Sequence, residues 1–204
     1  MTSHAQNDIM RFMKSKLFAV VCAASMFSAA SAPAASGMKT AVFAGGCFWS
    51  MEKAFEATPG VVDAVSGYSG GSAPNPTYQN HPGYLESVKV TYDPAKISYA
   101  QLVDSYYHHI DPTDPYGQIC DKGPSYRLAV FVGDAQERAI ADAARTRYGK
   151  ELGAKITVTT RNAAPFWKAE AYHQDFARRN PVRYEQYRVG CGRDRVLKTV
   201  WAAR

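Results

Sequence analysis

The sequence lacks several patterns that define large classes of protein. It has no CxxC and no HExxH spacing, which argues against a metal centre built on either pattern. It contains no internal repeat, and its 46% hydrophobic and 21% charged residues give no signal of disorder or of a coiled coil. A chain of 204 residues therefore suits one domain with an adequate core, alone or with an appended segment.

Long apolar runs are also missing, apart from one near the start of the chain. That run covers 17–30, follows Lys14 and Lys16, and precedes a stretch of small residues. This order is typical of a secretory signal peptide, and the run is too short and too rich in Ala and Ser to span a membrane comfortably. We therefore expect 1–35 to be removed and 36–204 to form a single domain. We expect that domain to be periplasmic or secreted, without stable membrane association.

The formal net charge is +6, and much of the excess lies in the first segment and in the arginines near the end. Basic surfaces can attract nucleic acid or anionic membranes. No nucleic-acid-binding signature accompanies this charge, so we interpret it as a solvated basic face. We expect no nucleic-acid partner.

His108 and His109, with Asp111, Asp114 and Asp121, are the one cluster that resembles a set of metal ligands. Adjacent histidines at the end of a helix do not face the same way, and the spacing fits no common site. We expect no metal and no other cofactor.

Strand and helix patterns alternate along the chain. Strand patterns cover 39–44, 61–68, 85–92, 127–132 and 155–160, and helical patterns cover 47–57, 98–109, 134–149 and 168–179. The first six of these elements have the order β-α-β-β-α-β. The order predicts an α+β fold, namely a ferredoxin-like split β-α-β two-layer sandwich with an added strand and a C-terminal helix and tail.

The cysteines give the strongest indication of function in the sequence. Without 1–35 the chain keeps Cys47, Cys120 and Cys191, and an odd number in an exported protein indicates a free thiol. Cys47 follows a strand and a Gly-Gly turn and begins a helix, where backbone N–H groups and the positive helix end lower the pKa of a thiol. We therefore interpret Cys47 as a reactive thiolate, with a buried inert cysteine as the alternative.

Phe48 and Trp49 follow Cys47 directly. In the first turn of a helix, at least one of them should flank the thiol instead of entering the core. An aromatic wall beside a thiolate suits a small apolar group such as a methyl on sulfur. Ordinary core packing is the alternative.

Strand alternation places a carboxyl group on a buried face. Glu86 shares one face of its strand with Val88 and Val90. Desolvation there raises the pKa of a carboxyl group and makes it a proton donor near neutral pH. A salt-bridged glutamate at the strand end is the alternative. By the same alternation the hydroxyl group of Tyr126 should lie at the rim of the core.

Two long loops lie beside these strands, over 69–83 and 111–123. Long loops in a compact domain are usually functional or disordered, and their content of Tyr, Asp and Gly favours function here. Tyr78 lies in the first loop and Asp121 in the second.

At this point the motifs match a known family. Residues 45–49 (GGCFW) resemble the Gly-Cys-Phe-Trp signature of the A-type peptide methionine sulfoxide reductases. Further matching segments follow in the family's order, at 67–71, 75–78, 86–94, 111–113, 125–127 and 169–175. The resemblance covers about residues 38–201, and so many motifs in one order are highly specific.

The resemblance implies a mechanism. The thiolate of Cys47 would attack the sulfoxide sulfur, while Glu86 protonates the departing oxygen and Tyr78 and Tyr126 hydrogen-bond it. Asp121 matches an acidic residue of the family that would support Glu86 or the substrate. Cys47 would become a sulfenic acid, which a second thiol converts to a disulfide for reduction by a thioredoxin-like donor.

Phe48 and Trp49 would hold the S-methyl group. The A type acts on the S epimer of methionine sulfoxide, so the resemblance implies oxidised proteins or peptides as substrates and repair of oxidative damage as the role. We expect a monomer.

The chain departs from the family pattern around its other cysteines. Cys120 directly precedes Asp121, and the tail carries Cys191 between Gly190 and Gly192. Glycines give a tail the reach to approach a sulfenic acid, so we expect Cys191 to be the resolving cysteine. Cys120 is the alternative.

Two other functions fit parts of the sequence. A hydrolase could use Cys47 as nucleophile and His173 as base. A binding module could present the tyrosine-rich loops to a peptide or glycan. Only a reductase would form methionine from a sulfoxide-containing peptide in the presence of a dithiol.

Overall fold

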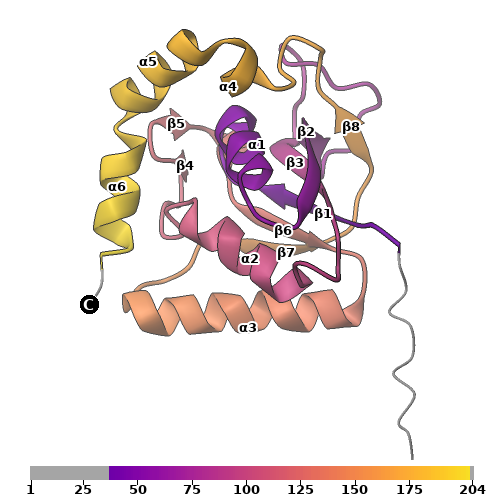
Figure 1. Ribbon diagram of the computed structural model, residues 1–204, viewed down its shortest axis with the longest axis vertical. Helices are drawn as coiled ribbons and strands as arrows, with labels where there is room; N and C mark the ends of the chain where they lie inside the picture. Colours follow the sequence, from indigo (N-terminus) through magenta and orange to yellow (C-terminus); the bar gives the residue numbers. More distant parts are fainter. Residues whose placement is uncertain (1–36, 203–204) are drawn as a thin grey trace, which may run out of the picture. The chain divides into compact units, whose positions relative to one another are not determined.

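A computed structural model describes residues 37–202, and its centre is a six-stranded sheet (Figure 1). The strands are β1 (Lys39–Ala44), β2 (Val61–Ser69), β3 (Leu85–Tyr92), β6 (Ala129–Val132), β7 (Thr159–Asn162) and β8 (Phe166–Lys168). They lie in the order β7-β6-β1-β3-β2-β8, and every neighbouring pair is antiparallel except β6 and β7. The four inner strands, β6-β1-β3-β2, have the predicted ferredoxin-like order, so the predicted fold class is confirmed.

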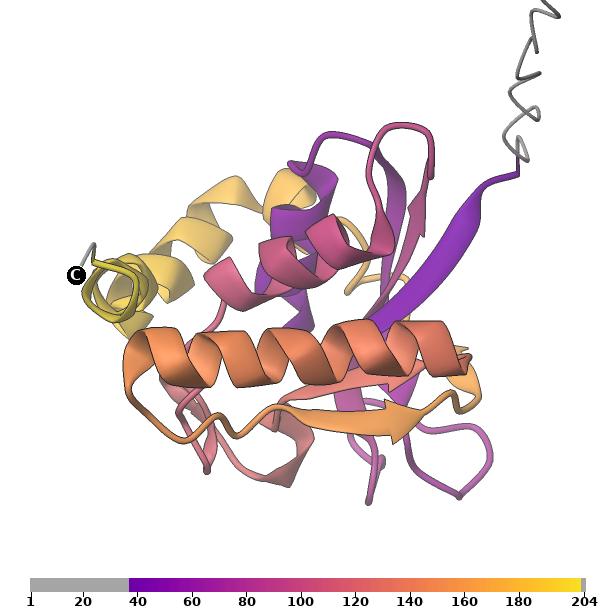
Figure 2. The ribbon, with the colours of Figure 1, turned by 90° about the horizontal axis from the view of Figure 1, so that it is seen from below.

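The helices are α1 (Phe48–Glu56), α2 (Tyr99–His108), α3 (Ala135–Leu152), α4 (Phe176–Arg179), α5 (Pro181–Cys191) and α6 (Arg193–Val200). A small hairpin, β4 (Gly117–Gln118) and β5 (Asp121–Lys122), and a 3-10 turn, η1 (Pro124–Tyr126), precede β6. Helices α1 and α2 lie over the sheet in Figure 1, and Figure 2 shows α3 lengthwise beside β7. Among residues 37–202 no helix is long and apolar enough to cross a bilayer.

Alternation along the inner strands divides their side chains between two faces. Phe43, Val88 and Val90 are fully buried in the main core between the sheet and the helices. Their neighbours Ala44 and Leu85 join a smaller cluster on the opposite face. A two-layer sandwich requires this division, because only one face of the sheet can meet the helices.

The predicted helix starts are confirmed by their caps. The side chain of Ser98 accepts from the backbone of Gln101 and that of Gln101 accepts in return, which is a complete capping box for α2. Asp134 caps α3 in the simpler way, by accepting from the backbone of Glu137. Helix α3 continues beyond its predicted end and stops at Gly153, whose φ of 60° suits a left-handed C-cap.

Two predicted elements near the end of the domain are wrong. The strand expected at 155–160 begins later, because β7 pairs with β6 only from Thr159 onward. The helix expected at 168–179 is replaced by strand β8, several turns and the short helix α4. Strand β8 pairs with the edge of β2 over Gly67–Ser69, and from the predicted helix only Lys168 and Ala169 take part in this backbone contact with the edge.

The C-terminal segment is helical, whereas the sequence predicted a mobile tail around Cys191, with Gly190 and Gly192 giving it reach. Gly190 lies inside α5, and Gly192 separates α5 from α6 with a φ of 66°. The guanidinium group of Arg193 donates to the carbonyl of His109 at 2.6 Å, and the indole of Trp201 donates to the carbonyl of Ile110 at 3.0 Å. These bonds tie the segment to the end of α2, and Figure 1 shows α4, α5 and α6 following one another along one side of the domain.

Candidate active site

Cys47 lies at the junction of β1 and α1, as the Gly-Gly turn predicted. It is the N-cap of α1 and is 6% exposed. Gly46 has a φ of 82°, and a Cβ atom there would lie 2.4 Å from the Cβ of Gln118. A larger residue is therefore excluded on both conformational and steric grounds, and the glycine lets the thiol sit close to the loop that carries Gln118.

The expected low pKa of the Cys47 thiol is wrong for this structure. Burial raises its pKa to about 12, and the nearby carboxyl groups of Glu86 and Asp121 add to the rise. A hydrogen bond from the Trp49 backbone lowers the pKa, but it is too weak to offset the desolvation. The helix end does face the sulfur, yet the thiol stays protonated at neutral pH until something else removes its proton.

Glu86 lies on the buried face of β3, as alternation predicted, and is 2% exposed. Its carboxyl group accepts from the backbone N–H of Phe48 at 3.0 Å, one residue beyond the thiol. Burial raises its pKa to about 8, with a further contribution from Asp121. The carboxyl group is therefore protonated at neutral pH and can donate a proton beside Cys47.

Aromatic side chains form one wall of the site. The ring of Phe48 packs against His173 with centroids 4.8 Å apart, and Trp49 stacks on Phe176 at 3.7 Å. The indole N–H of Trp49 donates to Nδ1 of His173 at 3.0 Å, which fixes the plane of the indole. Phe48 is 1% exposed and belongs to the core, whereas Trp49 is partly buried and packs against it.

Glu170 holds the loop that carries Tyr78. One carboxylate oxygen accepts from the backbone N–H of Tyr78 at 2.8 Å, and the other accepts from the hydroxyl group of Tyr68 at 2.9 Å. Burial raises the pKa of the Tyr78 phenol and that of the Tyr126 phenol, and the carboxyl group of Glu86 adds to both rises. Both phenols are therefore neutral donors near Glu86.

Asp121 lies on the other side of the thiol, and burial raises the pKa of its carboxyl group. The hydroxyl group of Tyr187, from α5, donates to Asp121 Oδ2 at 2.6 Å. The same hydroxyl group lowers the pKa of the Cys47 thiol, against the larger effect of burial. Helix α5 thus closes the site through Tyr187.

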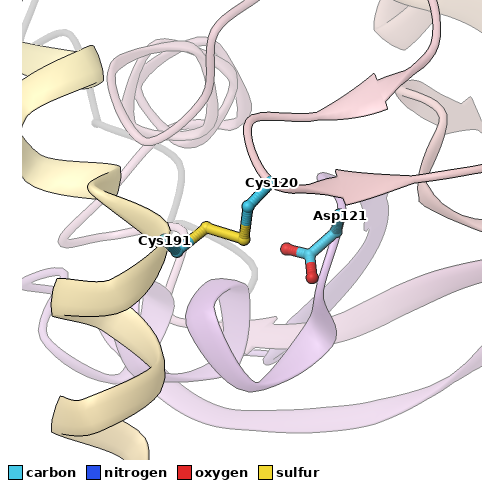
Figure 3. A group of neighbouring side chains, drawn as sticks. All are labelled: Cys120, Asp121 and Cys191. Carbon is cyan, nitrogen blue, oxygen red and sulfur yellow. A yellow bond between two sulfur atoms is a disulfide. The ribbon is translucent and has the colours of Figure 1, made fainter.

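Cys120 and Cys191 form a disulfide with Cα atoms 5.3 Å apart, and Cys47 is the free cysteine of the described residues. Figure 3 shows the disulfide joining the end of α5 to the turn of the β4–β5 hairpin, with the Asp121 carboxyl group beside it. Both sulfur atoms and a carboxylate oxygen of Asp121 lie within 4.8 Å of one another. The two cysteines considered as alternatives are therefore partners.

Three histidines of the part of the chain that the structure describes, His108, His109 and His173, are held by hydrogen bonds within the fold. Nδ1 of His173 is occupied by Trp49, and burial lowers the pKa of the ring, so it is not placed as a base for Cys47. His108 and His109 each hydrogen-bond through Nδ1 to a carbonyl of their own helix. This geometry disfavours the alternative of a Cys-His hydrolase.

Known proteins are similar to this chain in sequence. A family model described as peptide methionine sulfoxide reductase matches residues 39–204. A relative from Caulobacter vibrioides, named peptide methionine sulfoxide reductase MsrA 2, is 49% identical over 193 residues, covering 91% of this chain and 98% of the relative. A relative of the same name from Rhizobium meliloti is 46% identical over 166 residues, covering 80% and 84%. The chain belongs to the peptide methionine sulfoxide reductase family.

Solved structures agree with this family. Methionine sulfoxide reductase A of Corynebacterium diphtheriae superposes with a TM-score of 0.64 at 31% identity, covering 72% of this chain and 76% of that one. Reduced Mxr1 of Saccharomyces cerevisiae superposes with a TM-score of 0.66 at 27% identity, covering 71% and 87%. This reductase therefore has the fold of A-type relatives as well as their sequence motifs.

Sequence reasoning missed two residues of the site in this reductase. Glu170 was recognised only as part of a matching segment, because its role depends on β8 pairing with β2 and was hidden by the predicted helix. Tyr187 carries no local signal of function, since its bond to Asp121 depends on how α5 packs on the domain. One signal was available: Tyr187 and Cys191 have the spacing i, i+4, which places them on one face of a helix.

Proposed function

We propose that this reductase converts methionine sulfoxide in proteins and peptides to methionine through Cys47. The observation that carries the assignment is the free thiol of Cys47 beside the protonated carboxyl group of Glu86, which is anchored at the start of the same helix. Attack of the Cys47 thiolate on the sulfoxide sulfur needs a proton for the departing oxygen, and Glu86 is placed to give it. The oxygen ends on Cys47 as a sulfenic acid, and the substrate sulfur gains two electrons.

Two separate groups of side chains would orient the substrate. The phenols of Tyr78 and Tyr126 lie on the side of Glu86 and would hydrogen-bond the sulfoxide oxygen. Phe48 and Trp49 would contact the S-methyl group. A fixed oxygen site and a fixed methyl site accept one configuration at sulfur, which supports selectivity for the S epimer.

Recycling requires a second thiol, and the geometry favours Cys191. Cys191 lies one turn beyond Tyr187 on the same face of α5, and Tyr187 bonds to Asp121, whose carboxyl group raises the pKa of Cys47. Its thiol would condense with the sulfenic acid, releasing water and forming a Cys47–Cys191 disulfide. The thiolate of Cys120 would then attack Cys191 and release the Cys47 thiol. The product of that exchange is the Cys120–Cys191 disulfide of this structure.

A dithiol donor would complete the cycle. Cys120 is exposed whereas Cys47 is buried, so the Cys120 sulfur is the accessible point of attack for a thioredoxin-like protein. The exchange returns both cysteines to thiols and leaves the donor as a disulfide.

We propose that this reaction takes place outside the cytoplasm, because residues 1–35 have the pattern of a signal peptide. These residues lie outside the part of the chain that the structure describes. We also propose that the enzyme acts as a monomer. Cell fractionation and size-exclusion chromatography test these two statements.

The decisive experiment is a single-turnover assay of the reduced enzyme with a sulfoxide-containing peptide. Cys47→Ser should form no methionine, because neither of the other thiols reaches the oxygen and methyl sites. The Cys120→Ser variant is the matched control, since it removes one thiol and should form one equivalent of methionine. Substantial methionine from Cys47→Ser would refute the assignment.

A further inference from the structure

Four basic side chains that the proposed reaction does not use surround one pocket. The pocket has a volume of about 480 Å³, and residues from α3, from β7 and from the segments just before β6 and β7 line it. Its basic residues are Arg127, Arg145, Lys155 and Arg161. These four side chains and the space between them are called the basic pocket below.

The charges of the basic pocket are not neutralised within the fold. None of the salt bridges formed among residues 37–202 involves any of the four side chains. Asp114 is the only carboxylate among the described residues that line the pocket, and it is already paired with Lys122. Unpaired cations that converge on one pocket attract anions, and the guanidinium groups match a carboxylate or a phosphate in shape.

The register of the sheet places the basic pocket at the same end of the sheet as the thiol. Ala44, Ala129 and Thr159 form one row across β1, β6 and β7. Strand β1 runs toward this end and is followed by Cys47, whereas β6 and β7 begin at this end and run away from it. The residues just before β6 and β7, among them Arg127, therefore lie at the end of the sheet where Cys47 lies.

A short stretch of extended chain can span the thiol and the basic pocket. Neighbouring strands lie about 4.8 Å apart, so β7 is about 10 Å from β1 along the row. An extended peptide advances about 3.3 Å per residue. A substrate with its methionine sulfoxide at Cys47 therefore brings a residue about three or four positions away to the basic pocket.

We propose that the basic pocket binds acidic side chains of the protein substrate, so that the reductase favours methionine sulfoxide with Asp or Glu about three or four residues away. The proposal rests on the proposed function, because the pocket selects among substrates of that reaction. The shared end of the sheet favours a polypeptide over a nucleic acid or free phosphate, because only a polypeptide carries the sulfoxide to Cys47.

The exposure of the four side chains limits the size of the effect. Arg127, Arg145 and Lys155 are exposed, and Arg161 is half-buried. Exposed ion pairs each contribute little, and salt screens them. Two acidic residues should therefore lower KM by about 5-fold at low ionic strength, and high salt should remove the gain.

Matched peptides test the preference. Each peptide carries one methionine sulfoxide, and the residues three and four positions away are Glu-Glu, Gln-Gln or Lys-Lys. One set has this pair on the N-terminal side of the sulfoxide and the other set has it on the C-terminal side. In one set we expect kcat/KM at low ionic strength to be about 5-fold higher for Glu-Glu than for Gln-Gln, through KM, and lowest for Lys-Lys. Equal values in both sets would overturn the proposal.

Removing charge from the pocket should remove the preference. In Arg145→Gln with Lys155→Gln, the ratio of kcat/KM between the Glu-Glu and Gln-Gln peptides should fall to about 1. This ratio cancels any general loss of activity. Arg195→Gln with Lys198→Gln is the matched control, because it removes the same two charges from exposed positions of α6 that do not line the pocket. A ratio that persists in the pocket variant, or that falls equally in the control, would overturn the proposal.

Binding without reduction separates this proposal from the proposed function. Fluorescence anisotropy measures binding of labelled Glu-Glu and Gln-Gln peptides that contain unoxidised methionine. If the parent prefers the Glu-Glu peptide and the pocket variant does not, but the parent forms no methionine from sulfoxide, the function fails and the pocket stands. If the parent reduces every peptide with the same kcat/KM, the pocket fails and the function stands.

The same binding assay tests the choice of ligand. A short single-stranded oligonucleotide with the charge of the Glu-Glu peptide serves as competitor. We expect it to displace the labelled Glu-Glu peptide no better than the unlabelled peptide does. Displacement at clearly lower concentrations would assign the pocket to nucleic acid and overturn the proposal.

Discussion

Glu86→Gln should make the protein more stable at alkaline pH while slowing its chemistry. The substitution keeps the shape of the side chain and an oxygen that can accept from the backbone N–H of Phe48. It removes a carboxyl group whose pKa burial raises from 4.5 to about 8. The folded protein therefore holds a proton on Glu86 over a pH range in which the unfolded chain has lost it.

The size of the effect follows from these two pKa values. Because the native state binds more protons, the free energy of unfolding falls as pH rises between them, by about 1.4 kcal/mol per pH unit for this one group. Between about pH 5.5 and about pH 8.5 the contribution of Glu86 changes by about 3 kcal/mol. The stability of Glu86→Gln relative to the parent should rise by that amount across the interval.

Urea unfolding followed by circular dichroism at both pH values measures the difference, with the Cys120–Cys191 disulfide kept oxidised. Comparing two pH values cancels any fixed cost of the substitution itself. Glu151→Gln, at an exposed position of α3, is the matched control and should change by less than about 0.5 kcal/mol. A relative stability of Glu86→Gln that does not change with pH would refute the raised pKa, and with it the case for Glu86 as the proton donor. The same variant should lose about 100-fold in the single-turnover rate.

Three further outcomes follow from the site. Cys191→Ser should release one equivalent of methionine and then stall with Cys47 as a sulfenic acid. Cys120→Ser should instead accumulate a Cys47–Cys191 disulfide. A Cys47–Cys120 link found in the parent by mass spectrometry would reverse the roles of the two cysteines. Supplied with both epimers of a methionine sulfoxide peptide, the enzyme should stop near half conversion with the R epimer left, and complete conversion would contradict the two fixed sites. Glu170→Gln should free the Tyr78 loop and lower kcat/KM by about 10-fold, mainly through KM; an unchanged KM would show that this bond does not position the loop.

Much of the fold could be predicted because the relevant signals are local. The alternation of apolar residues along 85–92 placed Glu86 on the core face, and the structure confirms the same bounds for β3. Ser98 and Gln101 mark the start of α2 because their capping box involves only neighbouring residues. Such patterns depend on a few consecutive side chains, so contacts with distant segments of the chain do not change the structure that they predict.

The failures share one cause, which is contact between distant segments. Residues 168–179 have the composition of a helix, yet Lys168 and Ala169 bond to the edge of β2 and the carboxylate of Glu170 reaches the Tyr78 loop. The pKa of Cys47 was predicted from its place at a helix start. The decisive influence is burial beneath α5 and next to two carboxyl groups from other elements.

The same burial explains how the site can hold a reactive cysteine without exposing a thiolate. Cys47, Glu86 and Asp121 would each carry negative charge when ionised, and burial raises the pKa of all three. Such a site disfavours a second negative charge, so forming the thiolate requires a neighbouring carboxylate to become neutral. Oxidation of a cysteine follows its thiolate character and exposure, and Cys47 has little of either before a substrate arrives. Attack on a sulfoxide consumes the negative charge of the thiolate while Glu86 gives its proton to the oxygen and becomes a carboxylate, so the site gains no second negative charge and the reactivity of Cys47 is confined to the substrate it reduces.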